Sequence, residues 1–355
     1  MKPVNVAIIG CGTIAHSAHG PSYAKNPEAR IAYCVDIIPE RAQSLADQFG
    51  DRETRVTTDY HDILQDESVE MVSVCVPNYL HAPISIDCLN AKKHVLCEKP
   101  AAMNYQEVLK MKEAADQNDR ILNIGVVNRF NTAVNKVHDL IQAGELGDLY
   151  HIYCSFRSFR SIPGLGGQFT TRALSGGGVL IDWGVHFIDL ICYCIHSPVV
   201  KTVSGATYSK LGRNMKEYVY TSMWAGPPDY NGTYDVEDFV TGLIRTEGPT
   251  ICLNGAWAQN INDDAMFIEF LGDKAGIKLQ YGGKFTIYGT KNGMLTETAC
   301  DMKMADMFYD EIDAFIKSAR KGEKIRSNID EVLVTAQIMD ALYQSAEEGR
   351  EVVFI

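Results

Sequence analysis

The sequence lacks long hydrophobic runs. No uncharged apolar stretch approaches the roughly 18 residues that a membrane-spanning helix requires. The segment Met1–Val6 leads directly into an apolar strand-like run, without the separate apolar stretch and cleavage site of a secretory signal. From these two absences we expect a cytoplasmic protein that does not insert into a membrane.

The sequence has fewer basic than acidic residues. Lys and Arg number 33 against 45 Asp and Glu, which gives a formal net charge of −12. Nucleic acids and anionic membranes both attract basic surfaces. We therefore expect no nucleic acid and no membrane as partner, whereas a small neutral substrate is fully compatible with this charge.

The 10 cysteines include no CxxC pair. Cys192 and Cys194 lie close together on an apolar helical pattern, for which two buried thiols are a simpler interpretation than a metal site. Reduced thiols agree with a cytoplasmic location. The sequence also lacks internal repeats, low-complexity tracts and a flexible linker.

What the sequence does contain is a regular alternation of apolar runs and helical periods in its first part. This alternation predicts an α/β Rossmann domain, with a doubly wound parallel sheet, over residues 1–126. The expected strands are 4–9, 31–35, 71–76, 94–97 and 121–126, and the expected helices are 14–25, 39–49, 84–91 and 105–117.

The pattern changes after residue 126. Successive strand-like runs without intervening helices predict an α+β domain with a large, mostly antiparallel sheet over residues 127–355. The expected strands include 149–156, 238–245, 251–259, 266–271 and 285–288. The expected helices are 133–143, 179–195, 305–320 and 329–348, with a loop rich in Gly and Arg over 157–178.

A glycine turn, Gly10-Cys11-Gly12-Thr13-Ile14-Ala15, follows the first expected strand and opens the first expected helix. Gly10 permits the tight turn, Gly12 lets the backbone approach a pyrophosphate, and Ala15 allows close packing of helix on strand. Amide groups and the dipole at the helix start favour phosphate. A GxGxxA match alone is weak, but this context is the one that a dinucleotide site requires.

Asp36 ends the second expected strand, 21 residues after Ala15 (36 − 15). A carboxylate there accepts hydrogen bonds from the ribose hydroxyls and repels a 2′-phosphate, which predicts NAD rather than NADP. Arg41 follows about one helical turn later and could weaken that preference. The predicted cofactor contacts of this region are Gly10, Gly12, Thr13, Ile14, Ala15, Asp36, Ile37 and Arg41.

Two further segments contain candidate catalytic residues. Glu98-Lys99-Pro100 follows a buried strand, and ligands bind beyond the carboxyl ends of such strands, so Lys99 is a candidate for moving a proton. Asp182 and His186, at i and i+4, share one face of an apolar helix. A mutually satisfied Asp–His pair in the core remains an alternative. Asp189, one turn further on, raises the possibility of a metal site, but no third ligand is evident and we expect no metal.

Three motifs together resemble the glucose–fructose oxidoreductase, inositol dehydrogenase and rhizopine-catabolism family, called Gfo/Idh/MocA. They are the GxGxxA turn, the segment Pro77-Asn78-Tyr79-Leu80-His81 leading to Glu98-Lys99-Pro100, and the segment from Gly176 to His186. The resemblance implies that the second domain is open-faced, carries the substrate pocket and often builds an oligomer interface. We therefore expect a homo-oligomer, either a dimer or a tetramer or larger. It also implies a cis Lys99–Pro100 bond.

The resemblance further implies roles for individual residues. Lys99 contacts the reacting hydroxyl and the cofactor, Asp182 orients the substrate, and His186 is the acid/base. The residues expected at the nicotinamide are Pro77, Asn78, His81, Glu98, Lys99 and Asn128.

The substrate implied by the resemblance is a sugar, glycoside or inositol, oxidised frequently at ring carbon 3. Predicted substrate contacts are Arg157, Arg172, Asp182 and His186. The loop from Arg157 to Arg172 contains three arginines and two aromatic residues, which suit sugar hydroxyls and faces but serve salt bridges and packing equally well. A nucleotide sugar or sugar acid stays open.

Histidine titrates nearest neutral pH, so His186 is the expected general base, with Lys99 polarising the hydroxyl. Two other enzymes on the same fold remain open: a redox-assisted glycosidase that restores its NAD, and a sugar–sugar oxidoreductase that retains NAD. A third alternative is an NAD-binding sensor without activity. A sensor would be expected to lack Lys99, Asp182 and His186, and all three are present.

Overall fold

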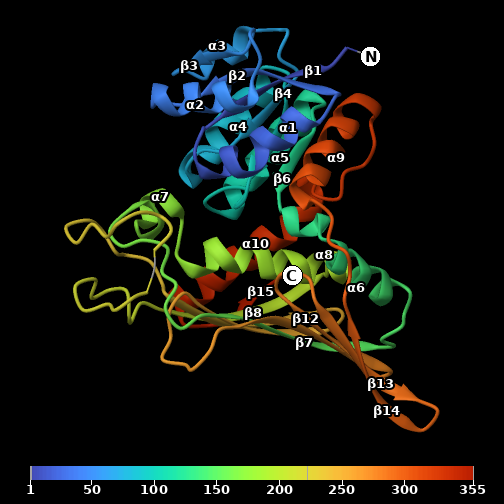
Figure 1. The fold of residues 1–355 in the computed structure, drawn as a ribbon. Helices are drawn as coiled ribbons and strands as arrows, with labels where there is room; N and C mark the ends of the chain where they lie inside the picture. Colours follow the sequence, from blue (N-terminus) through green and yellow to red (C-terminus); the bar gives the residue numbers. More distant parts are fainter. Residues whose placement is uncertain (1, 222, 355) are drawn as a thin grey trace. The chain divides into compact units, whose positions relative to one another are not determined.

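The computed structural model describes residues 2–221 and 223–354. The chain forms two compact units (Figure 1). One contains the chain up to Phe130 together with Ala305–Leu333, and the other contains Asn131–Met304 together with the chain from Val334 onward.

The sheet of the first unit has six parallel strands in the order β3-β2-β1-β4-β5-β6. This is the strand order of dinucleotide-binding domains, so the predicted Rossmann domain is confirmed. Its strands are β1 (Val4–Ile9), β2 (Ala29–Val35), β3 (Arg55–Thr57), β4 (Met71–Val74), β5 (His94–Glu98) and β6 (Leu122–Gly125).

Helices connect these strands, and their starts follow from local sequence. The side chain of Asn104 caps α5 by accepting the amide hydrogen of Glu107, and Pro39 opens α2, where a missing amide hydrogen costs nothing. The helical segments are η1 (Ala15–His19), α1 (Gly20–Lys25), α2 (Pro39–Phe49), α3 (His61–Gln65), η2 (Asn78–Leu80), α4 (His81–Asn90), α5 (Tyr105–Asn118), η3 (Val127–Phe130) and α9 (Met307–Lys321).

The placement of α9 differs from the sequence-based boundary, which put everything after residue 126 in the second domain. Ile312, Phe315 and Ile316 of α9 belong to the same hydrophobic core cluster as side chains of β1 and β2. The segment after α9 also joins this unit, since the Ile124 amide donates to the Ser327 carbonyl oxygen at 3.0 Å. Packing between distant segments, rather than sequence order, assigns 305–333 to the first unit.

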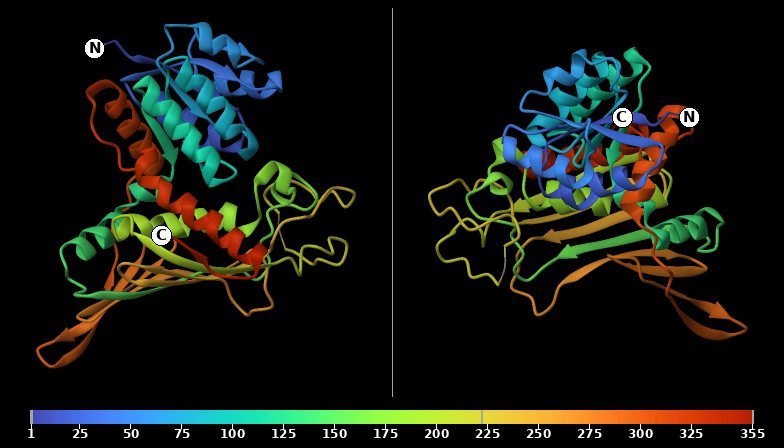
Figure 2. Two further views of the ribbon diagram at one scale, coloured as in Figure 1. Left: turned by 180° about the vertical axis from the view of Figure 1, so that it is seen from behind. Right: turned by 45° about the horizontal axis from the view of Figure 1, so that its top comes forward.

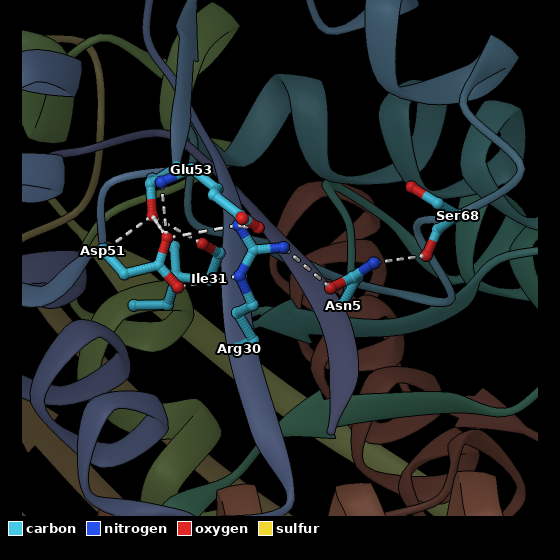
Figure 3. Close-up of polar contacts among 7 residues, drawn as sticks. Asn5, Arg30, Ile31, Asp51, Glu53 and Ser68 are labelled. Carbon is cyan, nitrogen blue, oxygen red and sulfur yellow. Dashed lines mark hydrogen bonds and ion pairs between the residues drawn. The ribbon is translucent and has the colours of Figure 1, made fainter. Parts of the chain in front are cut away.

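A polar network ties the surface of β1 and β2 to nearby loops (Figure 3). The Arg30 guanidinium donates from Nε to Asp51 Oδ2 at 2.8 Å and pairs with Glu53 at 3.0 Å. Arg30 holds the pKa of Asp51 at about 2. Asn5, within 3.5 Å of Arg30, donates in turn to the Ser68 carbonyl oxygen. Because the carboxylates are solvent-exposed, this network organises loops more than it adds stability.

The second unit is built on a nine-stranded sheet in the order β14-β13-β12-β11-β7-β10-β9-β8-β15. All pairs are antiparallel except β7 with β10, which confirms the mostly antiparallel sheet. Its strands are β7 (Leu149–Arg157), β8 (Val200–Tyr208), β9 (Phe239–Thr246), β10 (Thr250–Ala256), β11 (Ala265–Gly272), β12 (Ala275–Gln280), β13 (Phe285–Lys291), β14 (Met294–Cys300) and β15 (Val352–Val353).

Helix α8 (Val185–Cys194) and the part of α10 (Ile329–Glu348) from Val334 onward lie along one face of this sheet (Figure 2). Successive side chains along each strand point to opposite faces of the sheet. In β10, Ile251 and Leu253 therefore enter the core, whereas Cys252 does not. The remaining helical segments are α6 (Thr132–Gln142), η4 (Gln168–Thr170), α7 (Arg172–Ser175) and η5 (Leu180–Gly184).

One helical stretch, Arg172–Cys194, is long and apolar enough by composition to cross a membrane. However, 83% of its apolar window is buried in the protein, and it contains Asp182 and Asp189. It is the central core helix of the second unit. All ten cysteines are free, and eight of them are buried.

Candidate active site

The glycine turn lies at the carboxyl end of β1, next to the ends of β2 and β4. Gly10 has a φ of +91°, and a Cβ there would lie 2.4 Å from the Cys75 carbonyl oxygen, so the turn requires glycine. A Cβ on Gly12 would meet no protein atom within 4 Å. Packing within the protein therefore does not require glycine at position 12, and the space beside Gly12 is open. Ala15 is fully buried in η1, where the predicted helix begins as a π-helical turn.

Asp36 lies at the carboxyl end of β2 and joins the second strand to the glycine turn. Its Oδ2 accepts the amide hydrogen of Cys11 at 2.8 Å, and its Oδ1 accepts that of Ile38 at 2.9 Å. Ile37 beside it is 87% exposed, which is unusual for so apolar a side chain. Thr13 and Arg41 are exposed nearby in sequence, and Ile14 is half-buried.

These residues fit a dinucleotide. The open space at Gly12 suits a pyrophosphate, the helix start supplies amide donors, and Asp36 keeps lone pairs for ribose hydroxyls beyond the two amides it binds. The exposed Ile37 offers an apolar surface next to that carboxylate.

Lys99 follows β5, and its peptide bond to Pro100 is cis, as the resemblance implied. Its amide donates to Glu98 Oε2 at 3.1 Å. Glu98 is buried and its Oε1 lies 2.9 Å from His19 Nε2, while His19 Nδ1 lies 3.1 Å from the Ser73 hydroxyl. Burial alone would raise the pKa of Glu98, but the His19 hydrogen bond and nearby positive charges outweigh it and lower that pKa.

His81 connects the segments that follow β4 and β5. Its Nδ1 lies 2.6 Å from the Pro100 carbonyl oxygen and its Nε2 lies 2.8 Å from that of Val76. The ring is 1% exposed, and burial lowers its pKa. His81 therefore braces the backbone beside Lys99. Asn78 lies in η2 directly after Pro77, and Asn128 is buried in η3, after β6.

Asp182 and His186 lie on the helix that η5 and α8 form together. The sequence predicted a continuous α-helix, whereas the structure has a π-helical turn at Leu180–Gly184, a distortion often found at functional sites. Asp182 is 8% exposed and its Oδ2 accepts the indole hydrogen of Trp257 at 3.2 Å. His186 is half-buried, with its ring 6.4 Å from that of Tyr281 between centroids.

The three arginines of the 157–178 loop differ in their surroundings. Arg160 donates to the Phe159 and Gln259 carbonyl oxygens and to Asn260, so it holds the loop together. Arg157 Nε donates to Ser155. Arg172 is exposed at the start of α7, with its guanidinium 5.6 Å from the Tyr343 ring centroid.

Asp189, the residue that raised the possibility of a metal site, is buried and accepts the hydroxyl hydrogen of Thr335 at 3.1 Å. Within residues 2–221 and 223–354, no group of three or more His, Cys, Asp or Glu side chains is placed to hold a metal ion.

The structure thus gathers the first-unit candidates at the carboxyl edge of one parallel sheet and places the second-unit pair on one helix. No sequence motif indicated His19 or Trp257, which hold Glu98 and Asp182. The signal that the sequence offered was their residue type, since each has a ring N–H that needs a partner when buried.

Comparison with known proteins decides the family. Residues 4–126 match the oxidoreductase family with an NAD-binding Rossmann fold, and residues 134–294 match the GFO/IDH/MocA C-terminal domain. The chain is 32% identical over 355 residues to D-glucoside 3-dehydrogenase of Escherichia coli (strain K12), covering 99% of this chain and 97% of that protein. The chain belongs to the GFO/IDH/MocA oxidoreductase family. It is an NAD-binding oxidoreductase.

Two further proteins are similar over a shorter length or at lower identity. Inositol 2-dehydrogenase of Salmonella typhimurium (strain LT2) is 35% identical over 118 residues, 33% of this chain and 34% of that protein. Among solved structures, levoglucosan dehydrogenase in complex with NADH and levoglucosan superposes with a TM-score of 0.85 at 20% identity, covering 99% of both chains. That likeness supports the shared family fold.

Proposed function

We propose that this GFO/IDH/MocA member oxidises a ring hydroxyl of a sugar, glycoside or polyol with NAD⁺, and that a D-glucoside oxidised at carbon 3 is the first substrate to test. The observation that carries the proposal is the 32% identity, over nearly the whole of both chains, to an enzyme named D-glucoside 3-dehydrogenase. Inositol and levoglucosan dehydrogenases among the similar proteins support a cyclic polyol substrate.

The proposed mechanism divides proton handling among three residues. The glycine turn at Gly12 and the Asp36 carboxylate would hold NAD⁺, which would supply a hydride acceptor for the carbon that bears the hydroxyl. His186, which is half-buried, takes the hydroxyl proton, because histidine is the side chain most often used as a general base. The Lys99 ammonium polarises the hydroxyl oxygen. Asp182, fixed by the Trp257 indole, orients the substrate by accepting a hydrogen bond.

A panel of glycosides, free sugars and inositols tests the proposal, with NADH absorbance and sugar products followed together. A dehydrogenase forms NADH and a ketone in equal amounts. Cleavage of a glycoside without NADH would favour the redox-assisted glycosidase. Oxidation of one sugar with reduction of another, while NAD stays bound, would favour the sugar–sugar oxidoreductase.

We also propose a homo-oligomer in the cytoplasm that binds neither nucleic acid nor membranes, in line with the net charge of −12. The sheet face opposite α8 and α10 supports self-association. It presents Tyr153 and Phe267, whose rings lie 5.9 Å apart, and Lys278 lies 3.8 Å from the Phe267 ring centroid. Light scattering on the purified chain and on Phe267→Glu measures the mass; a monomeric wild type would reject this part of the proposal.

A further inference from the structure

The carboxylate of Glu237 holds the start of the helix that carries Asp182 and His186. It precedes β9 and is 8% exposed. Its Oε1 accepts the amide hydrogens of Gly178 and Leu180, each at 3.0 Å, and its Oε2 also lies 3.0 Å from the Gly178 nitrogen. Leu180 is the first residue of η5, so the carboxylate binds amides that a helix start leaves unpaired.

Tyr343 of α10 completes this anchor. Its hydroxyl donates to Glu237 Oε1 at 2.8 Å. Its ring also lies beneath the Arg172 guanidinium, a predicted substrate contact. Glu237 thus receives donors from the glycine run and from a second helix, which fixes the carboxylate from two sides.

The glycine run is shaped by these same two residues. A Cβ on Gly178 would lie 2.0 Å from the Glu237 carbonyl oxygen, and a Cβ on Gly177 would lie 2.0 Å from the Tyr343 hydroxyl oxygen. Only glycine permits so close an approach. The run therefore serves to press the helix start against its anchor.

We infer that Glu237 is a positioning residue for Asp182 and His186. Asp182 lies two residues after Leu180, so one end of its turn is held by Glu237 while its carboxylate is held by Trp257. In Glu237→Gln an NH2 group replaces one of the two oxygens that lie 3.0 Å from the Gly178 nitrogen, and the remaining oxygen is a weaker acceptor, so the helix start loosens and both side chains are misplaced. The inference rests on the proposed function, in which these two residues act on the substrate hydroxyl.

Asp238, the next residue, provides a matched control. It is 1% exposed and likewise accepts backbone amide hydrogens, from Lys210, Leu211 and Gly212. Like Glu237 it is a buried carboxylate that accepts backbone amide hydrogens, but the loop that it holds does not carry Asp182 or His186. Glu237→Gln and Asp238→Asn therefore separate positioning of the helix from general stabilisation.

The test measures kcat, KM, NADH affinity and Tm for the full-length wild type and both variants. For Glu237→Gln we expect kcat to fall about 10- to 100-fold, because small misplacements of reacting groups cost this much, with NADH affinity within about twofold of wild type. For Asp238→Asn we expect kcat within about twofold of wild type. This should hold even if the Tm of Asp238→Asn falls as far as that of Glu237→Gln. Equal kcat in Glu237→Gln and wild type, or equal losses in both variants, would overturn the inference.

If Glu237→Gln does not fold, Tyr343→Phe gives a milder test, since it removes one donor and keeps the ring beneath Arg172. We expect kcat to fall only about threefold, with unchanged NADH affinity, because Glu237 loses one donor but keeps its bonds to the Gly178 and Leu180 amides. An unchanged kcat in Tyr343→Phe would overturn the inference. An inactive wild type would refute the proposed function and with it this role, whereas an active wild type with an equally active Glu237→Gln would refute the positioning role alone.

Discussion

The indole nitrogen of Trp257 lies 3.2 Å from Oδ2 of Asp182, and both side chains are buried. Trp257→Phe keeps an aromatic ring but removes the donor to the carboxylate. A hydrogen bond to a charged group contributes about 1.5–3 kcal/mol, so we expect kcat to fall at least about tenfold. Steady-state kinetics measures this. Trp224→Phe makes the same change at a tryptophan that is 64% exposed and should leave kcat unchanged; equal rates in wild type and Trp257→Phe would reject the role of the indole.

The ionisation of Glu98, whose carboxylate lies 2.9 Å from His19 Nε2, makes stability depend on pH. The pKa of Glu98 lies below its ordinary value of 4.5, so the ionised carboxylate stabilises the fold above that pH, and this contribution is lost as the pH falls through the native pKa. His19→Ala leaves a buried carboxylate without this donor, which should cost about 2–3 kcal/mol of unfolding free energy at pH 7. Protonation of Glu98 then relieves the cost in acid.

Urea unfolding of wild type and His19→Ala at pH 7 and at pH 4.5 measures that difference. The two proteins should differ less at the lower pH. His61→Ala removes a histidine from an exposed pair with Asp59 and should change stability little at either pH. A stability difference that stays constant between the two pH values would show that Glu98 is not the group responsible.

Gly10 and Gly12 are expected to fail in different ways when replaced by alanine. Gly10→Ala places a Cβ 2.4 Å from the Cys75 carbonyl oxygen at a φ of +91°. The free energy of unfolding should therefore fall by about 2–4 kcal/mol, and Tm should fall with it. Gly12→Ala meets no protein atom, so Tm should stay unchanged while NADH affinity weakens. Calorimetry and fluorescence titration measure both. Wild-type NADH affinity in Gly12→Ala would show that this space does not receive the cofactor.

Asp36 should decide between the two nicotinamide cofactors. Its carboxylate repels a 2′-phosphate, so wild type should bind NADH much more tightly than NADPH. Asp36→Asn removes the charge but keeps an oxygen acceptor, and we expect discrimination to fall at least about tenfold, the worth of one partly screened charge contact. The preference of Arg41→Ala for NADH over NADPH, measured in the same way, serves as the comparison. Equal preference in wild type and Asp36→Asn would assign the selectivity elsewhere.

Lys99→Ala should abolish turnover and leave NADH affinity nearly intact, because the ammonium acts on the substrate hydroxyl while the glycine turn and Asp36 hold the cofactor. Kinetics with a titration of NADH on the same sample measures both. Unchanged turnover would remove Lys99 from the mechanism.

Local patterns in the sequence were sufficient for the Rossmann sheet, the ends of α2 and β1, and the positions of Asp36 and Lys99 after their strands. Features that depend on distant partners were not predictable. Trp257 and Asp182 are 75 residues apart, and Glu237 and Gly178 are 59 apart. The packing of α9 on the first unit is likewise a long-range event. β3 and α3, of three and five residues, are too short to show a hydrophobic period.

Hydride transfer from a sugar ring carbon to NAD⁺ can be followed with deuterium. The full chain is incubated with NAD⁺ and a D-glucoside deuterated at carbon 3, and both products are analysed by mass spectrometry. We predict that the deuterium appears in the reduced nicotinamide and that the sugar becomes a 3-ketone. Reduced nicotinamide without deuterium would contradict transfer from carbon 3, and deuterium retained in an unoxidised sugar would contradict the proposed function.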